Sequence, residues 1–272
     1  MTIEANFLKS AVRPAGNAFN SITTLNSEKA AKINPFVEEY VWENLIVGHI
    51  RNFLDKNGKE KPMEICDIGC GSGVTLERIC REIKSRSGLL QATAIDLMPD
   101  NISSARKKLQ ELGVDVSRIS KGDVTKKFPS GNFDLIIASQ LIHWLKPEEV
   151  GKLFQNVADS MNNNGVFIIS YATRLNNACL RDKEGKLDLE RGKRSSAAGN
   201  PIHIFSHSSG EEMTFFSKED LLKLAEENGL KGGFYLETDN LYYPTRNELL
   251  RTYKSQKFIN SRENAYMAFG KK

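Results

Sequence analysis

Between residues 62 and 172 the chain alternates between two patterns of hydrophobic and polar positions. One pattern is a short, densely apolar run bounded by turn residues, typical of a buried strand, and it occurs at 63–68, 89–97, 133–140 and 165–172. The other has apolar residues at the i, i+3, i+4, i+7 spacing and predicts helices over 74–85, 99–113 and 147–165. With a short strand before Gly122, this alternation predicts an α/β domain whose parallel sheet has helices on both faces. Ligands of such sheets bind at the carboxyl ends of the strands.

The flanking segments follow other patterns. Residues 35–58 predict a helix, with Pro35 in its first turn and Gly58 at its end. After Ala172 the alternation stops, and residues 174–214 are polar and rich in Gly, Ser and Asn, which predicts either a functional lid or disorder. Regular elements return towards the end of the chain, as a capped helix at 217–229, a strand at 232–239, a helix at 245–258 and a strand at 264–271.

The first predicted strand ends in Asp67 and is followed by three glycines, in the run Asp-Ile-Gly-Cys-Gly-Ser-Gly. Glycines this dense indicate a tight turn and close approach of a ligand to the backbone, and the following helix adds unpaired N–H groups. A dinucleotide fingerprint needs glycine or alanine where this chain has Val74, and Asp67 would repel a pyrophosphate. A ligand with a cationic group fits better.

Composition narrows the class of protein. The 272 residues are 40% hydrophobic and 26% charged, as in ordinary soluble domains. The net charge of +4 is too small to indicate a nucleic-acid partner. The first twenty residues lack the apolar core of a signal peptide, and no apolar run suggests a membrane partner. Four cysteines without paired metal spacing predict reduced thiols in a cytoplasmic protein: Cys66, Cys70, Cys80 and Cys179.

The run from Asp67 to Gly73 resembles the first motif of the class I (seven-stranded, Rossmann-like) S-adenosylmethionine-dependent methyltransferases. Three further motifs match in order: Asp96 after the second strand, Asp123-Val124 after the third, and the segment 133–145 around the fourth. The resemblance implies a Rossmann-like, doubly wound seven-stranded sheet, mostly parallel with a reversed last strand at 264–271. It also implies an N-terminal helical cap over 1–60 and a methyltransferase domain over 61–272. Within that domain, the insertion at 174–214 would be a substrate cover.

The same resemblance implies S-adenosyl-L-methionine as cofactor and S-adenosyl-L-homocysteine as product. In the family, the acid and the glycine turn hold the methionine part, the second acid binds the ribose hydroxyls, and the third acid accepts from the adenine amino group. The cofactor residues expected here are Asp67, Gly69, Cys70, Gly71, Asp96, Leu97, Asp123, Val124 and Ser139. Each acid also has a purely structural alternative. Asp67 could simply end a strand, Asp96 could interact with the dipole at the start of the next helix, and Asp123 could stabilise a turn.

The methyl acceptor is less defined. The chain lacks the Asn/Asp-Pro-Pro-aromatic motif of base methyltransferases after the fourth strand. Its segment SQLIHWL is similar to small-molecule carboxylate methyltransferases of the trans-aconitate and malonyl-thioester type, and is compatible with amine methyltransferases. We expect Gln140, His143 and Trp144 on the substrate side, although a tryptophan in this position is more often part of the core. His143 is the candidate general base for a hydroxyl or amine acceptor, whereas a carboxylate, ionised at neutral pH, needs no base.

The sequence therefore predicts a methyltransferase that transfers a methyl group to a small-molecule carboxylate, amine or hydroxyl by in-line displacement. The protein would mainly supply proximity and exclude water. No metal is expected, because His203 and His207 lack an acidic or cysteine partner. The alternatives are a protein methyltransferase and a non-catalytic cofactor-binding module. A nicotinamide-dependent oxidoreductase is a further alternative, which Asp67 and Val74 disfavour. Oligomeric state stays open.

Overall fold

A computed structural model describes residues 42–57, 61–83, 89–172, 201–206, 211–238 and 264–271. Its strands in chain order are β1 Met63–Ile68, β2 Leu90–Asp96, β3 Ile119–Lys121, β4 Phe133–Ser139, β5 Met161–Ala172, β6 Ile202–Ser206, β7 Glu211–Phe215, β8 Leu230–Thr238 and β9 Asn264–Lys271. Seven of them form one sheet in the order β3-β2-β1-β4-β5-β9-β8, and β6 and β7 form a separate two-stranded sheet.

Strand directions in the large sheet agree with the prediction. The pairs β1–β2, β1–β4, β2–β3 and β4–β5 are parallel, whereas β9 is antiparallel to both β5 and β8. The chain winds from β1 through β2 to β3 at one edge and then returns to β4 on the other side of β1. Open α/β sheets bind their ligands at such a reversal of strand order, at the carboxyl ends of the strands.

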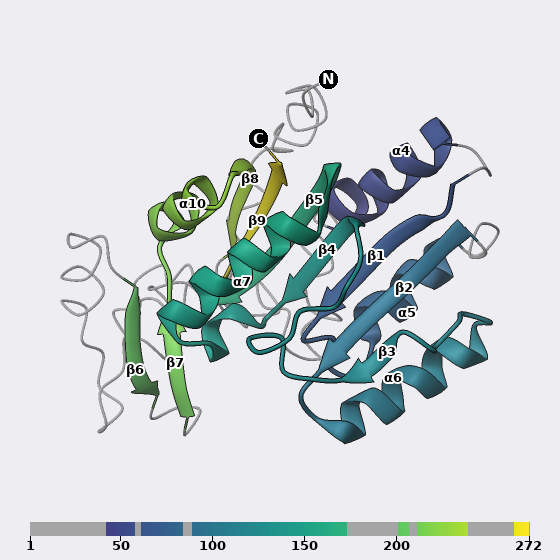
Figure 1. Ribbon diagram of the computed structural model, residues 1–272, viewed down its shortest axis with the longest axis horizontal. Coiled ribbons are helices and arrows are strands. Elements are labelled where there is room, and N and C mark those ends of the chain that lie inside the picture. Colours follow the sequence, from purple (N-terminus) through teal and green to yellow (C-terminus); the bar gives the residue numbers. More distant parts are fainter. Residues whose placement is uncertain are drawn as a thin grey trace, which may run out of the picture.

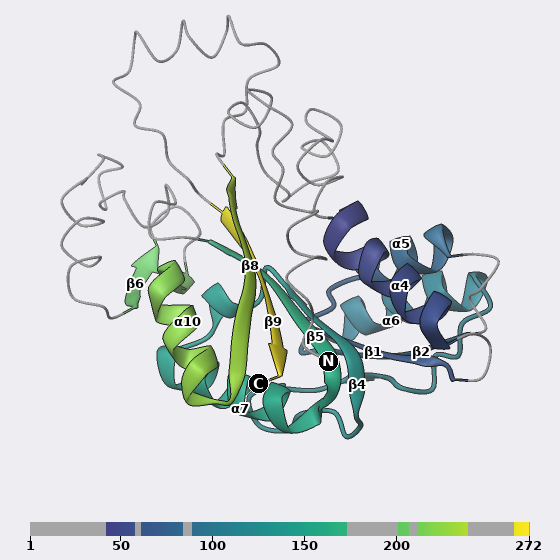
Figure 2. The same ribbon diagram turned by 90° about the horizontal axis from the view of Figure 1, so that it is seen from above.

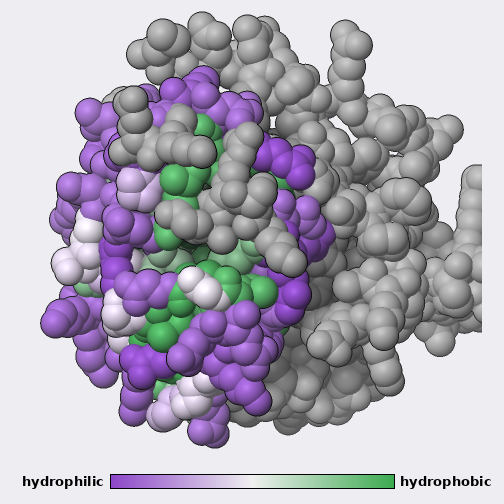
Figure 3. All heavy atoms as spheres, turned by 90° about the vertical axis from the view of Figure 1, so that its right-hand side faces the viewer, coloured by the Kyte–Doolittle hydropathy of each residue, from purple (hydrophilic) through white to green (hydrophobic). Residues whose placement is uncertain are grey.

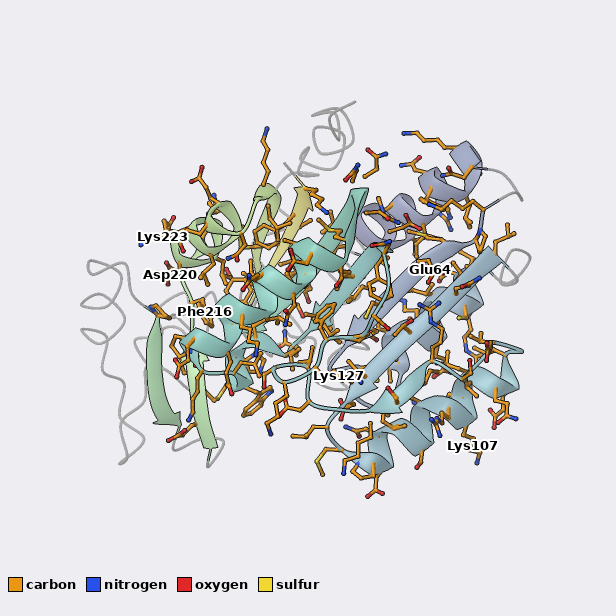
Figure 4. All side chains as sticks on the ribbon, in the orientation of Figure 1. Glu64, Lys107, Lys127, Phe216, Asp220 and Lys223 are labelled. Carbon is orange, nitrogen blue, oxygen red and sulfur yellow. The ribbon has the colours of Figure 1, made fainter. Side chains whose placement is uncertain are left out.

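Helices cover both faces of the sheet (Figures 1 and 2). The helical elements are the π-helix η2 Trp42–Val47, α4 Gly48–Asn57, α5 Val74–Glu82, α6 Pro99–Glu111, the 3₁₀ turn η4 Ile142–Trp144, α7 Pro147–Ser160 and α10 Lys218–Glu227. Buried residues of η2, α4, α5 and α6 form one core cluster, and those of η4, α7 and α10 form the other. Charged side chains such as Lys107 on α6 and Lys223 on α10 project away from the sheet (Figure 4).

Alternation along the strands assigns each side chain to one face. In β1, Met63 and Ile65 pack with α4, α5 and α6, whereas Cys66 and Ile68 pack with α7. By the same period of two, Asp67 shares the face of Ile65. The central strands are buried on both faces, which explains why their sequences are continuous apolar runs.

Residues 42–57 of the predicted N-terminal cap are part of the core. Ile50 and Leu54 of α4 are buried, and they lie in the same cluster as Ile65 of β1. The prediction of a helix over 35–58 is confirmed for 42–57, and residues 35–41 lie outside the described part. No helix among the described residues is long and apolar enough to cross a bilayer. On the face at the right of Figure 1, hydrophilic side chains surround a central strip of apolar ones (Figure 3).

The predicted end of the helix over 147–165 is wrong. Helix α7 ends at Ser160, and Met161 is already extended and opens β5 opposite Phe133. The reason is a side-chain contact: the Asn162 amide donates to the Asp134 carboxylate at 2.6 Å and to the Asn132 carbonyl at 3.2 Å. Asparagine is a poor helix former, so these contacts favour the strand over another helical turn.

Part of the insertion at 174–214 has regular structure that the sequence did not predict. Strands β6 and β7 pair antiparallel, with Ile202 opposite Phe215 and Ser206 opposite Glu211. The hairpin contacts η4, and the hydroxyl of the fully buried Thr214 donates to the Leu145 carbonyl. The rest of the insertion lies outside the described residues, as do His207, Cys179 and the predicted helix at 245–258.

Candidate functional site

The turn after β1 has a backbone that only glycine adopts easily. Gly69, Gly71 and Gly73 have φ angles of +68°, +52° and +79°. A side chain on Gly73 would place its Cβ 2.8 Å from the Ala105 Cβ, so this glycine lets α5 begin against α6. No atom of the described residues lies within 4 Å of the position that a Cβ on Gly71 would take. Gly71 is therefore the point at which the turn faces open space.

Asp67 lies beneath this turn and is 1% exposed. Neither carboxylate oxygen has a hydrogen-bond partner among the described residues. Burial, followed by the negative charge of Asp96, raises the pKa of Asp67 to about 7. A buried carboxylate without donors is costly and favours either a proton or a cation beside it. Together with the open backbone at Gly71, this fits a ligand that brings a positive charge, as the expected cofactor does with its ammonium group.

Asp96 ends β2 and is held by donors on three sides. Its Oδ2 accepts from the Gly71 N–H at 2.8 Å. Its Oδ1 accepts from the Met98 N–H at 2.9 Å and from the Asn101 side-chain amide at 3.0 Å. These bonds join the glycine turn, the end of β2 and the start of α6 into one unit. An ionised carboxylate has about four acceptor positions, so capacity remains for a ligand hydroxyl.

Asp123 has local partners. Its Oδ1 accepts from the Thr125 hydroxyl at 2.6 Å and from the Thr125 N–H at 3.0 Å, and its Oδ2 lies 3.1 Å from Lys126 Nζ. The Thr125 hydroxyl bond and the Lys126 contact keep the pKa of Asp123 below its ordinary value. The turn role that the sequence left open is thus present. Contact with an adenine amino group stays a prediction.

Apolar side chains line the rim of the site. Leu97 and Met98, which follow Asp96, are 59% and 56% exposed, although large apolar side chains are usually buried. Val124, next to Asp123, is buried. Leu97 and Val124 are the two apolar cofactor residues expected from the sequence. Their exposure differs: Leu97 lies in the short connection between β2 and α6, whereas Val124 belongs to the same buried cluster as Ile95.

The carboxyl ends of β4 and β5 carry a polar cluster. The hydroxyls of Ser139 and Ser170 lie 3.1 Å apart, at paired positions of the two strands. The Gln140 N–H donates to the Ser170 carbonyl at 2.9 Å and to the Ser170 hydroxyl at 3.0 Å. Ser139 and Gln140 are expected site residues. Ser170 has no sequence motif, and only strand pairing reveals it.

His143 lies in η4 and is 4% exposed. Its Nδ1 has no hydrogen-bond partner within the described parts of the chain, and burial lowers its pKa to about 4. The imidazole is therefore neutral at pH 7. Trp144 is 44% exposed, with its ring centroid 4.9 Å from that of His143. Trp144 is therefore not a core residue, and its contact with an acceptor stays a prediction.

The described residues contain no group of three or more histidine, cysteine or acidic side chains that could hold a metal. Cys66, Cys70 and Cys80 are free thiols and buried, as the sequence predicted for them. Burial raises the pKa of the Cys66 thiol and that of Cys80, the latter to about 11. None of the three is therefore a reactive thiolate at neutral pH.

Comparison with known proteins identifies the family of the chain. A family model described as a methyltransferase domain matches residues 41–232. The malonyl-[acyl-carrier protein] O-methyltransferase of Priestia megaterium is 25% identical over 230 residues, which cover 79% of this chain and 73% of that protein. Two non-reducing polyketide synthases of Penicillium brasilianum are 24% identical over 130 residues. That match covers 46% of this chain and only 5% of each synthase.

Among solved structures, magnesium protoporphyrin IX methyltransferase from Synechocystis, determined with bound S-adenosylhomocysteine, superposes with a TM-score of 0.51. Its sequence is 15% identical, and the match covers 87% of this chain and 88% of that one. At this identity the similarity shows the fold alone. The sheet order with its reversed β9 is thus shared with methyltransferases of this class.

Proposed function

This chain belongs to the methyltransferase-domain family, and from that premise we propose that it transfers a methyl group from S-adenosyl-L-methionine to a small-molecule acceptor. The observation that carries the proposal is the Asp67 carboxylate, buried under the glycine turn without a partner among the described residues. An ammonium group would satisfy it, and the Gly71 backbone leaves room for a ligand beside it.

The expected cofactor residues divide by chemistry. Asp67 and the turn Gly69-Cys70-Gly71 would hold the amino-acid end, and Asp96, held in place by Gly71, would accept from the ribose hydroxyls. Ser139 would complete this side at the end of β4. Leu97 and Val124 would flank the adenine, with Asp123 accepting from its amino group. Of these, the Asp123 role is supported least, because Thr125 and Lys126 already occupy its carboxylate.

When bound, the cofactor supplies a methyl group already activated by a sulfonium centre. The residues of this chain need only hold the acceptor in line, exclude water and receive a proton where the acceptor has one to lose. His143 is the candidate for the last task, because its imidazole is neutral. Burial lowers its pKa to about 4 and makes it a weaker base than an exposed histidine, so it would act by orienting the acceptor and taking the proton as the methyl group is transferred. Its unpartnered Nδ1 favours a hydroxyl or amine acceptor over a carboxylate, which has no proton to share at neutral pH.

The malonyl-[acyl-carrier protein] relative, by its name, methylates an acid-bearing substrate, so the carboxylate class remains part of the test. Gln140 and Trp144, which flank His143 in the same segment, would contact the acceptor. The insertion at 174–214 would cover it, which is supported by the packing of the β6–β7 hairpin on η4. Residues 42–57 of the predicted cap over 1–60 belong to the core, so a capping role stays a prediction for residues 1–41 alone.

Cofactor binding is tested by calorimetric titration of the full chain with S-adenosylhomocysteine, with NAD in parallel. We expect binding of the adenosyl compound alone, and Asp96→Ala should weaken it by about 10- to 100-fold, because hydrogen bonds to a charged group are lost. Asp115→Ala is the matched control, since Asp115 bonds only within its own surface turn at Ser117. Binding of NAD alone would overturn the proposal.

The acceptor class is tested by measuring S-adenosylhomocysteine formation with sets of phenols, amines and small carboxylic acids. For a hydroxyl or amine acceptor, His143→Gln should lower kcat by about 10²- to 10⁴-fold while cofactor affinity is kept. If carboxylic acids are methylated and His143→Gln does not slow the reaction, the acceptor is a carboxylate rather than a hydroxyl or amine. If the cofactor binds but no small molecule is methylated, the chain is either a protein methyltransferase or a non-catalytic cofactor-binding module.

A further inference from the structure

Gln140 has an unusual backbone conformation. Its φ angle is +54°, and no other non-glycine residue in the described part of the chain has a positive φ. An L-residue is strained in this left-handed region, and such strain persists only where the surroundings impose it. The residue lies where β4 ends and the chain turns into η4. Its conformation therefore sets the direction of the segment from Gln140 to Leu145, which contains His143 and Trp144 and is called the acceptor segment below.

Ser170 of β5 holds Gln140 in this conformation through its backbone and its side chain, and its carbonyl accepts from the Gln140 N–H at 2.9 Å. Its hydroxyl accepts from the Gln140 N–H at 3.0 Å and from the Gln140 side-chain amide at 3.2 Å. With both lone pairs occupied in this way, the hydroxyl proton of Ser170 is left for Ser139 Oγ, 3.1 Å away. The Ser139 hydroxyl can then donate its own proton to a ligand. Ser170 is 4% exposed, so it acts from within the sheet and has little surface of its own.

The other end of the acceptor segment is held from the inserted hairpin. The hydroxyl of Thr214 in β7 donates to the carbonyl of Leu145, the last residue of the segment. Thr214 is fully buried, and β7 packs against η4. Two hydroxyls that lie 44 positions apart in the sequence thus hold opposite ends of one six-residue segment.

We infer that Ser170 and Thr214 are positioning residues: together they clamp the acceptor segment at Gln140 and Leu145 and thereby fix where the His143 imidazole lies. The role in turnover rests on the proposed function, because it acts through His143. The clamp itself is a property of the chain without any substrate. It makes the inserted hairpin a support for the reacting group as well as a cover.

The clamp is tested by NMR of the full chain labelled with ¹³C and ¹⁵N in histidine. The chain has four histidines, so His143→Gln assigns the signal of interest. In the wild-type protein at pH 6 the His143 imidazole should be neutral, since burial lowers its pKa to about 4. Ser170→Ala and Thr214→Val should each shift this signal and produce a protonated fraction, because a released imidazole returns towards its ordinary pKa of about 6.5.

Three controls separate positioning from general stability. Thr93→Val removes another buried hydroxyl, one without a partner among the described residues, and should leave the His143 signal unchanged. Ser170→Thr and Thr214→Ser keep the hydroxyl and should restore the wild-type signal. Affinity for S-adenosylhomocysteine should stay within about twofold in Thr214→Val, because Thr214 contacts Leu145 at the far end of the segment. Ser170→Ala is left out of this control, because the Ser170 hydroxyl contacts Ser139 on the expected cofactor side.

An unchanged His143 signal in folded Ser170→Ala and Thr214→Val would overturn the inference and leave both hydroxyls as ordinary core contacts. If Ser170→Ala does not fold, Ser170→Cys and Ser170→Thr decide, since both fill the site and only threonine keeps the hydroxyl. With an acceptor in hand, each clamp variant should lower kcat, and Thr214→Val should do so with the KM for the cofactor unchanged. The NMR result needs no acceptor, so failure of the methyl-transfer proposal would not be mistaken for failure of the clamp.

Discussion

The carboxylates of Asp67 and Asp96 lie near the ends of two neighbouring strands, on one face of the sheet. The Asp96 carboxylate accepts hydrogen bonds, whereas that of Asp67 has no donor among the described residues. The negative charge of Asp96 adds to burial in raising the pKa of Asp67 to about 7. Two acids of similar sequence context therefore differ in their hydrogen bonding. Asp96 is anchored, and Asp67 can exchange a proton for a cation.

This difference predicts how stability depends on pH. Because the folded-state pKa of Asp67 is raised, the folded protein binds more protons than the unfolded chain between about pH 4 and 7, and its stability falls as pH rises through that window. The loss attributable to Asp67 is at most about 4 kcal/mol. Asp67→Asn removes this term, so its thermal midpoint should exceed that of the wild type by several degrees more at pH 8 than at pH 5. Equal differences at the two pH values would refute the assignment.

Ligand binding should release the same proton. A cation beside Asp67 favours the ionised carboxylate, so binding of S-adenosylhomocysteine at pH 6 should expel up to about one proton per site. Calorimetric titration in two buffers with different ionisation heats measures this number. Asp67→Asn, titrated under the same conditions, should release none. A proton count that is identical in both proteins would show that the cationic end of the ligand binds elsewhere.

Two glycines of the turn should affect different properties of the protein: Gly73 its stability and Gly71 its binding of the cofactor. Gly73→Ala combines a left-handed backbone with a Cβ placed 2.8 Å from that of Ala105, and should destabilise the fold by about 2–4 kcal/mol. Gly71→Ala meets open space and should cost only about 1–2 kcal/mol from its backbone. Its methyl group would instead occupy the space beside the turn and weaken S-adenosylhomocysteine binding. Urea unfolding and calorimetry on the pair measure both effects; equal loss of stability would contradict the packing at Ala105.

The strain at Gln140 can be measured with a second matched pair. Gln140→Gly and Gln140→Ala both lose the side-chain bond to Ser170, and they differ only in the Cβ that makes a left-handed backbone costly. The glycine variant should therefore be more stable than the alanine variant by about 1 kcal/mol. Chemical unfolding of the two proteins gives the difference directly. A more stable alanine variant would mean that the residue does not keep its left-handed conformation in solution.

Much of the fold and of the cofactor side could be predicted from the sequence, because these features depend on local patterns. Asp67, Asp96 and the glycine turn follow from strand ends and turn chemistry within single βα units. The hairpin of β6 and β7 could not be predicted, since its strands are embedded in a polar segment and their stability comes from packing on η4. The clamp residues were missed for a related reason: Ser170 and Thr214 contact residues 30 and 69 positions away.

The last strand of the sheet has a consequence for how the chain reaches its fold. β9 follows β8 in the sequence, yet it lies between β5 and β8 and pairs with both. On a ribosome, β8 would emerge with no sheet neighbour to join, and the exposed edge of β5 would wait for residues 264–271. Such long-range closure slows folding and leaves open edges prone to association. Synthesis of this protein should therefore include a vulnerable interval, ended only when β9 inserts and seals the sheet.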